Sequence, residues 1–186
     1  MKVLLLRPAA EKKSMARVLP LGLLAIGSVL KRAGHQVKIL DLRISNSPDE
    51  ELNAVMNSFD PQVVGIGVMT IECKYGFIDA AKVKKINPNV TVIFGGPHCS
   101  HEPQFILNDS NVDLMVSGEG DLTIVELVNT LEEGKDVADV PGIAYKKNGS
   151  YLRTTERPVI RDLDTIDQEY DLINLERYFN FQSSMD

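Results

Sequence analysis

The residues best suited to chemistry in this chain lie in the stretch I-F-G-G-P-H-C-S-H, residues 93–101. Histidine and cysteine bind metals, and two adjacent glycines let a phosphate or a flat cofactor approach the backbone. Metal chelation, phosphate binding and cofactor packing are therefore all open at this point. The spacing of His98, Cys99 and His101 matches none of the usual zinc patterns, and no second cluster completes a site. We assign no metal ligand.

A second stretch of interest, Ser117-Gly-Glu-Gly-Asp121, precedes a helical pattern. Its backbone N–H groups could bind polar ligand atoms, and Glu119 could bond either a ligand or neighbouring backbone. A plain turn, with Asp121 or Thr123 as helix N-cap, is the structural alternative. The chain has no G-x-G-x-x-G or G-x-x-x-x-G-K-[ST] phosphate loop and no G-x-S-x-G nucleophile elbow. We assign no catalytic residue.

Five apolar runs, separated by helical patterns, must position these two stretches. They predict strands at residues 3–6, 37–40, 63–68, 90–94 and 112–116. Because most of the runs are continuously apolar, both faces of each strand are expected to be covered, as in a parallel sheet. Right-handed crossovers then favour the strand order 2-1-3-4-5, a doubly wound, flavodoxin-like α/β fold.

Helical periodicity fills the intervals between the strands. The first helix is expected to have Pro20 in its first turn and to stop at Gly34, and Ser47-Pro-Asp-Glu50 predicts a capping box for the second. A short helix is expected at residues 103–107. The predicted buried faces are Leu23, Ile26, Gly27 and Leu30; Leu52, Val55, Met56 and Phe59; Ile71, Tyr75, Ile78 and Ile86; and Ile124, Leu127, Val128 and Leu131.

The chain divides into three predicted parts. Residues 1–140 form the α/β domain, and residues 141–155 form a β-hairpin around the strong turn signal Asn148-Gly149. Residues 156–186 show no regular period and are expected to be a linker that leads into a further domain.

Composition excludes several classes of partner. With 186 residues, 44% of them hydrophobic and 25% charged, the chain is ordinary globular material. Its net charge is −6 and it has no basic block, so nucleic acid is not an expected partner. The apolar run before Arg7 is too short for a signal peptide or a membrane span, and two cysteines make no disulfide framework. We expect a cytoplasmic protein without a membrane partner.

Ligands of an open parallel sheet bind beyond the carboxyl ends of its strands, near the point where the strand order reverses. That rule selects the long loop from Arg7 to Leu21, Met69-Thr70 after the third strand, and the two glycine-containing stretches. A receiver domain has the same fold but needs clustered acidic residues after strand one and a lysine after strand five. Arg7-Pro8 and Ser117-Gly118 occupy those positions, which excludes that class.

Five motifs in series resemble one family. The stretches L-L-R-P, L-P-L-G-L-L-A-I-G-S-V-L-K-R-A-G-H-Q-V, D-P-Q-V-V-G-I-G-V-M-T, I-F-G-G-P-H and S-G-E-G-D-L-T occur in this order within about residues 1–145. Together they are similar to the N-terminal cobalamin (B12)-binding domain of B12-dependent radical S-adenosylmethionine enzymes. In that family the corrin lies over the carboxyl ends of the strands, and the nucleotide tail of the cofactor enters between the loops.

The resemblance implies a set of cofactor-binding residues, and it implies that the opening stretch packs a cofactor without chelating a metal. Carried over position by position, the set comprises Pro20, Leu21 and Gly22 beneath the corrin; Gly67, Val68, Met69 and Thr70 in the tail pocket; Gly95, Gly96, Pro97 and His98 as a second wall; and Gly118, Glu119 and Gly120 as a third.

Two departures from related patterns matter. Other cobalamin modules carry D-x-H-x-x-G, whose histidine binds cobalt from below, but here Arg17 and Leu19 hold the aspartate and histidine positions. Cobalamin should therefore bind base-off and without a histidine ligand. The C-x-x-x-C-x-x-C motif that ligates an iron–sulfur cluster does not occur in the 186 residues. We therefore expect an N-terminal part of a longer enzyme, not catalytic alone.

The resulting prediction is a cobalamin-binding module of a radical S-adenosylmethionine enzyme. The parent, a methyltransferase or oxidoreductase, would use S-adenosylmethionine and a 4Fe-4S cluster for methyl transfer or a ring-forming oxidation. A cofactor-free docking or substrate-gating domain stays open, given Lys12, Lys13 and Arg17 in the first loop, and so does a flavin or nucleotide binder. An open pocket under Thr70 and Gly95 would favour the module over the docking domain.

Overall fold

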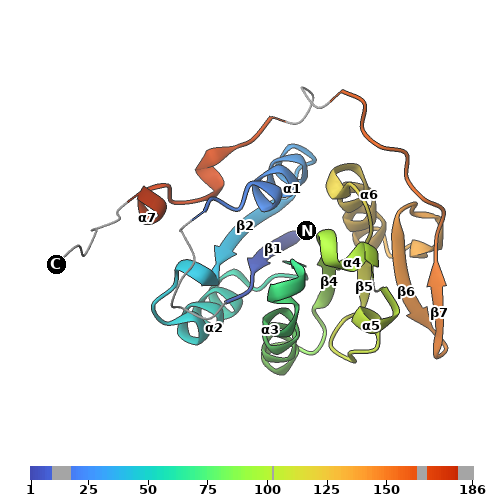
Figure 1. Ribbon diagram of the computed structural model, residues 1–186, viewed down its shortest axis with the longest axis horizontal. Helices are drawn as coiled ribbons and strands as arrows, with labels where there is room; N and C mark the ends of the chain where they lie inside the picture. The colour runs from blue at the N-terminus through green and yellow to red at the C-terminus, as the bar shows by residue number, and fades with distance from the viewer. Residues whose placement is uncertain (10–17, 102, 163–166, 180–186) are drawn as a thin grey trace.

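The computed structural model describes residues 1–9, 18–101, 103–162 and 167–179 (Figure 1). Its sheet has seven strands in the order β2-β1-β3-β4-β5-β6-β7, with a parallel core and an antiparallel hairpin at one edge. The predicted doubly wound order 2-1-3-4-5 is thereby confirmed, and the hairpin extends the same sheet. No helix of the described chain combines the length and the apolar character that a membrane crossing requires.

The element bounds lie close to the predicted ones. The strands are β1 (Lys2–Arg7), β2 (Gln36–Asp41), β3 (Val63–Gly67), β4 (Thr91–Gly95), β5 (Leu114–Val116), β6 (Ile143–Lys147) and β7 (Ser150–Arg153). The helices are α1 (Leu21–Arg32), α2 (Pro48–Phe59), α3 (Cys73–Ile86), α4 (Pro97–His101), α5 (Pro103–Leu107), α6 (Gly120–Glu132) and α7 (Glu176–Phe179). The described residues also form the short 3-10 helices η1 (Leu42–Ile44), η2 (Thr70–Glu72), η3 (Val137–Asp139) and η5 (Tyr170–Leu172).

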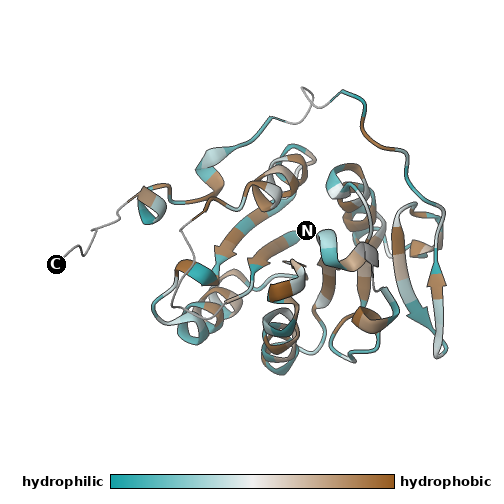
Figure 2. Ribbon diagram, viewed as in Figure 1, coloured by the Kyte–Doolittle hydropathy of each residue, from teal (hydrophilic) through white to brown (hydrophobic). Residues whose placement is uncertain are grey.

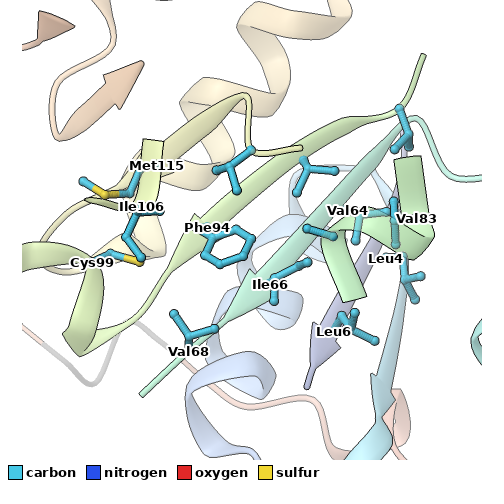
Figure 3. Close-up of a cluster of buried hydrophobic side chains, with 14 of the residues drawn as sticks. Leu4, Leu6, Val64, Ile66, Val68, Val83, Phe94, Cys99, Ile106 and Met115 are labelled. Carbon is cyan, nitrogen blue, oxygen red and sulfur yellow. The ribbon is translucent and has the colours of Figure 1, made fainter. Parts of the chain in front are cut away.

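Two hydrophobic cores cover the two faces of the sheet. Successive side chains of a strand point to opposite faces, so Leu4 and Leu6 of β1 enter one core and Val3 and Leu5 enter the other. Helices α2, α3 and α5 close the first core, which Figure 3 shows around Phe94, and α1 and α6 close the second. Figure 2 shows hydrophobic residues concentrated in the central strands. Burial on both faces explains why the strand sequences are continuously apolar.

The third helix packs with a different face from the predicted one. Ile71 and Ile78 are 65% and 43% exposed, so the stripe proposed from these isoleucines is wrong. Helix α3 instead buries small residues, among them Gly76 and Ala80. A Cβ at Gly76 would lie 2.7 Å from Val68 Cγ1, so the absent side chain is what lets the helix approach the sheet.

The predicted helix start holds for α2 but not its capping bond, and α1 and α6 begin at other residues than predicted, α1 at Leu21 with Pro20 as N-cap. Helix α2 begins at Pro48 with Ser47 as N-cap, yet the Ser47 side chain makes no capping hydrogen bond. The Ser47 N–H is instead held by Ser45 Oγ at 3.1 Å. Helix α6 has Glu119 as N-cap, and neither Asp121 nor Thr123 takes that position.

The parallel strands end together at one edge of the sheet, which we call the carboxyl edge. At this edge the loop after β3 and the turn after β4 are in backbone contact, since the Val68 N–H donates to the Gly95 carbonyl at 2.9 Å. Gly96 has a φ of +105°, and a Cβ there would lie 2.6 Å from the Val68 carbonyl oxygen. The tight turn at Gly95-Gly96 is thus required to bring two loops together, and α4 begins directly after it.

The chain beyond β7 returns across the helices α6 and α1 (Figure 1). Arg157 Nε donates to Thr123 Oγ1 on α6 at 2.8 Å, and the Glu169 N–H donates to Ser28 Oγ on α1 at 2.7 Å. Leu172 lies against α1, since its Cδ1 would be 3.0 Å from a Cβ at Gly27. The described part of the expected linker is therefore packed on the α/β domain.

We predict that Gly96→Ala lowers the free energy of unfolding by about 2 kcal/mol or more, because alanine at this φ is strained and its Cβ meets backbone. Gly95→Ala is the matched control. Its Cβ would have no neighbour within 4 Å, so a change of about 0.5 kcal/mol or less is expected. Urea unfolding of the three proteins measures both values. Equal losses for the two variants would contradict this account of the turn.

Candidate functional site

A cavity of about 440 Å³ opens at the carboxyl edge of the sheet. Its walls come from the strands β1, β3, β4 and β5, from α1 and α6, and from the loops that follow the strands. The pocket next to Gly95 is therefore open and not filled by side chains of the described residues. It lies where the order of the sheet reverses, which is the usual ligand position in this class of fold.

Most of the residues proposed from the sequence are brought together around this cavity. Pro20, Leu21, Gly22, Gly67, Val68, Met69, Gly95, Gly96, Pro97, Gly118 and Gly120 all line it. Thr70, His98 and Glu119 do not. Thr70 is exposed at the start of η2, and His98 is part of α4. The Glu119 carboxylate accepts the Ile160 N–H at 2.5 Å, so it already has a partner in the C-terminal part of the chain.

The lining glycines fall into two groups. A Cβ at Gly22, Gly95 or Gly118 would meet no atom within 4 Å, so these positions leave space around the cavity. A Cβ at Gly67 would lie 3.0 Å from Leu23 Cδ2, and one at Gly120 would lie 3.1 Å from Ile26 Cδ1. Gly67 and Gly120 thus let α1 approach the sheet and α6, while Gly22, Gly95 and Gly118 leave space that a ligand could fill. Gly96 serves the turn as described above.

The inner lining is aliphatic. It includes Leu5, Leu23, Ile26, Gly65, Ile93, Val116 and Ile124. Leu5, Gly65 and Ile93 are direct neighbours in register across β1, β3 and β4. The sequence analysis did not propose any of these residues as part of a ligand site. The available signal was Gly65, a glycine inside an otherwise apolar strand, because such a glycine often marks a site where another group approaches closely.

Two charged residues of the lining, Arg7 and Glu72, neutralise each other within a buried network. Glu72 Oε1 lies 3.7 Å from Arg7 Nε and accepts from Arg43 Nη1 at 3.1 Å, and Glu72 Oε2 accepts the Met69 N–H at 3.2 Å. Arg7 Nη1 also approaches Asp41 Oδ2, at 3.5 Å. Burial raises the pKa of Asp41, although the adjacent Arg7 charge counteracts this. The network joins the loops that follow β1, β2 and β3.

Asp121, in the first turn of α6, is the third charged residue of the lining. Its partial burial is the main cause that raises its pKa, and the nearby Glu119 charge raises the pKa further. The carboxyl group can therefore accept, or when protonated donate, a hydrogen bond to a polar part of a ligand.

The cysteine of the opening stretch does not face the cavity. Cys99 is fully buried within the core under α5, and burial, with a smaller effect of the neighbouring Cys73, raises the pKa of its thiol to about 12. Among the described residues, no group of three or more His, Cys, Asp and Glu side chains is arranged to hold a metal ion. The stretch therefore presents its glycines, and not its thiol, to the site.

Taken together, these features define an α/β domain with an open cavity at the carboxyl edge of its sheet. Residues 13–128 match the family described as the B12 binding domain. The chain therefore belongs to the B12-binding domain family, and its resemblance to the N-terminal regions of cobalamin-dependent radical S-adenosylmethionine enzymes is confirmed.

Curated relatives and solved structures agree with this assignment. The chain is 36% identical to an uncharacterized methyltransferase of Pyrococcus horikoshii and 29% identical to the anaerobic magnesium-protoporphyrin IX monomethyl ester cyclase of Synechocystis. Each match covers 96% of this chain but only 40% and 37% of the respective relative. In fold the chain resembles the radical S-adenosylmethionine methyltransferase TsrM from Kitasatospora setae, solved with cobalamin and a [4Fe-4S] cluster. That match has a TM-score of 0.74 at 21% identity and covers 83% of this chain and 30% of TsrM.

We predict that both thiols are unreactive in the native chain, because Cys73 and Cys99 are buried and burial raises both pKa values. A chromogenic disulfide reagent at about pH 8 should label the native protein at a rate at least about a hundredfold below that of a free thiol. The same reagent should label both residues rapidly in denaturant. Fast native labelling of Cys99 would contradict the assignment of this residue to the core.

Proposed function

We propose that this chain is the cobalamin-binding module of a radical S-adenosylmethionine enzyme and holds base-off cobalamin at the carboxyl edge of its sheet. The observation that carries the proposal is the open cavity, with its aliphatic interior and its glycine-lined entrance. Family membership supports the class of ligand, and the position of the cavity supports the binding edge.

The residues present fit such a cofactor. Side chains at Gly22, Gly95 and Gly118 would project into open space, so a bulky planar group can lie against the backbone here. The aliphatic interior between the sheet, α1 and α6 suits the heterocyclic base at the end of the nucleotide tail. Gly67, Val68 and Met69 would hold the tail, and Asp121 is placed to bond its polar groups.

The lower face of the corrin would meet an aliphatic residue in this chain. Leu19, at the position of the cobalt-ligating histidine in other modules, is partly buried and lines the cavity. A leucine cannot coordinate cobalt, and a tail inserted into the cavity keeps the cofactor's own base away from the metal. Bound cobalamin would supply alkyl-transfer and electron-transfer chemistry, while the chain orients it and excludes water from its lower face.

The rest of the parent enzyme is inferred from the relatives. Because the chain spans 40% and 37% of the two curated relatives, a following domain would carry the 4Fe-4S cluster and S-adenosylmethionine and would be the covalent partner of this module. The named methyltransferase and cyclase relatives support methyl transfer or a ring-forming oxidation as the reaction. In this view residues 1–140 bind the cofactor, the hairpin at 141–155 extends the sheet, and 156–186 leads to the following domain.

Both alternatives have less support. A cofactor-free docking domain would be expected to fill the space next to Gly95, and that space is open. The basic residues that favoured this alternative, Lys12, Lys13 and Arg17, lie outside the described residues. A flavin or nucleotide binder lacks the phosphate loop that such ligands usually need.

The test is an anaerobic titration of the purified chain with cobalamin, followed by desalting and an absorption spectrum. We expect retained cobalamin with a base-off spectrum. Gly95→Leu should weaken binding about tenfold or more, because Gly95 lines the cavity and a Cβ there points into open space. Ala54→Leu adds similar bulk on the exposed face of α2 and should bind like the unaltered chain.

Three results would count against the proposal. A folded chain that retains no cobalamin would contradict it. Base-on retention would contradict insertion of the tail into the cavity. Tighter retention of a flavin than of cobalamin, tested in the same desalting experiment, would favour the nucleotide-binding alternative.

A further inference from the structure

The described C-terminal segment, residues 167–179, places a buried tyrosine, Tyr178, at the carboxyl edge. Tyr178 is 6% exposed, and its hydroxyl donates to Asp41 Oδ2 at 3.1 Å. Next to it, Arg177 Nη2 lies 3.2 Å from both carboxylate oxygens of Glu51 on α2. The segment thus reaches the end of β2 and inserts one polar group into the charged network beneath the loops.

The carboxylate that receives Tyr178 is shared with the cavity. Asp41 Oδ2 also lies 3.5 Å from Arg7 Nη1, and the same guanidinium nitrogen donates to the Val18 carbonyl at 2.9 Å. Val18 directly precedes Leu19, which lines the cavity. A short chain of contacts therefore runs from Tyr178 through Asp41 and Arg7 to the last residues of the loop that follows β1.

In this series of contacts, the Tyr178 hydroxyl is a main partner of Asp41 Oδ2. Asp41 Oδ1 is already held by the Arg43 N–H at 3.0 Å, so Oδ2 is the oxygen left for Arg7 and Tyr178. Without the hydroxyl, Oδ2 keeps only the long contact to Arg7. A buried carboxylate with a lost partner tends to rotate or to admit water, and either change would weaken the Asp41 contact that helps to orient Arg7.

We propose that Tyr178 is a positioning residue of the cofactor site, acting through Asp41 and Arg7 to fix Val18 and Leu19 beneath the corrin. This inference rests on the proposed function. It has a thermodynamic consequence: the Tyr178–Asp41 contact and binding of cobalamin favour each other, and by the same factor in both directions. The segment that leads to the following domain would then help to complete the site.

A first measurement needs no cofactor. Hydrogen–deuterium exchange compares the unaltered chain with Tyr178→Phe and with the control Lys31→Ala, which removes the surface ion pairs to Glu169 and Asp171 but leaves the network intact. Tyr178→Phe should speed exchange of the amides in residues 18–24 several-fold, because Leu21 N–H and Leu24 N–H bond the carbonyls of Leu19 and Pro20. Exchange in α6 should not change.

A second measurement is a double-mutant cycle on cobalamin affinity with Tyr178→Phe and Arg7→Lys. Tyr178→Phe alone should weaken binding about three- to tenfold and Lys31→Ala should not. The effect of Tyr178→Phe should shrink in the Arg7→Lys background, because the route to Leu19 is already broken there.

Two outcomes overturn the inference: unchanged exchange in residues 18–24 of folded Tyr178→Phe, or additive effects in the cycle. If the unaltered chain binds no cobalamin, the proposed function fails, and the exchange experiment still decides whether Tyr178 positions Leu19.

Discussion

The contact between two loop backbones at Gly96 is the constraint on which the carboxyl edge depends. The turn after β4 approaches the Val68 carbonyl so closely that no side chain fits between them, and the Val68 N–H is bonded in return to the Gly95 carbonyl. This contact fixes the loops after β3 and β4 as one unit. The neighbouring Gly95, which has no neighbour in the direction of a side chain, then faces the cavity. Gly96 forms the turn, and Gly95 leaves space in the cavity.

A buried network of charged side chains connects the other loops of the carboxyl edge. Arg7, Asp41, Arg43 and Glu72 connect the loops after β1, β2 and β3, and Tyr178 extends the network into the C-terminal segment. Such groups stay charged in a poorly hydrated place only when each is paired. The network therefore adds polar contacts to loops that also bury Leu42 and Val68 in the core. Arg7 and Glu72 line the cavity, but their charges are already directed at each other and at the backbone.

Much of the fold was predictable because its local signals agree with its packing. Continuous apolar runs marked the parallel strands, and Asn148-Gly149 gave the hairpin, where both residues adopt positive φ. The face of α3 was not predictable, because hydrophobic periodicity favours isoleucines, whereas the helix packs through Gly76 and Ala80. The charged network was also missed. Its members are far apart in sequence, and only the register of the parallel strands brings Arg7 beside Asp41.

The central claim is that cobalamin binds at the carboxyl edge of the sheet, between α1 and α6. Hydrogen–deuterium exchange with and without cobalamin tests it most directly. The account predicts slower exchange in the loops after β3, β4 and β5 and in the first turns of α1 and α6, with no change in the hairpin β6–β7. Protection confined to the hairpin or to the outer face of α2 and α3 would contradict the account.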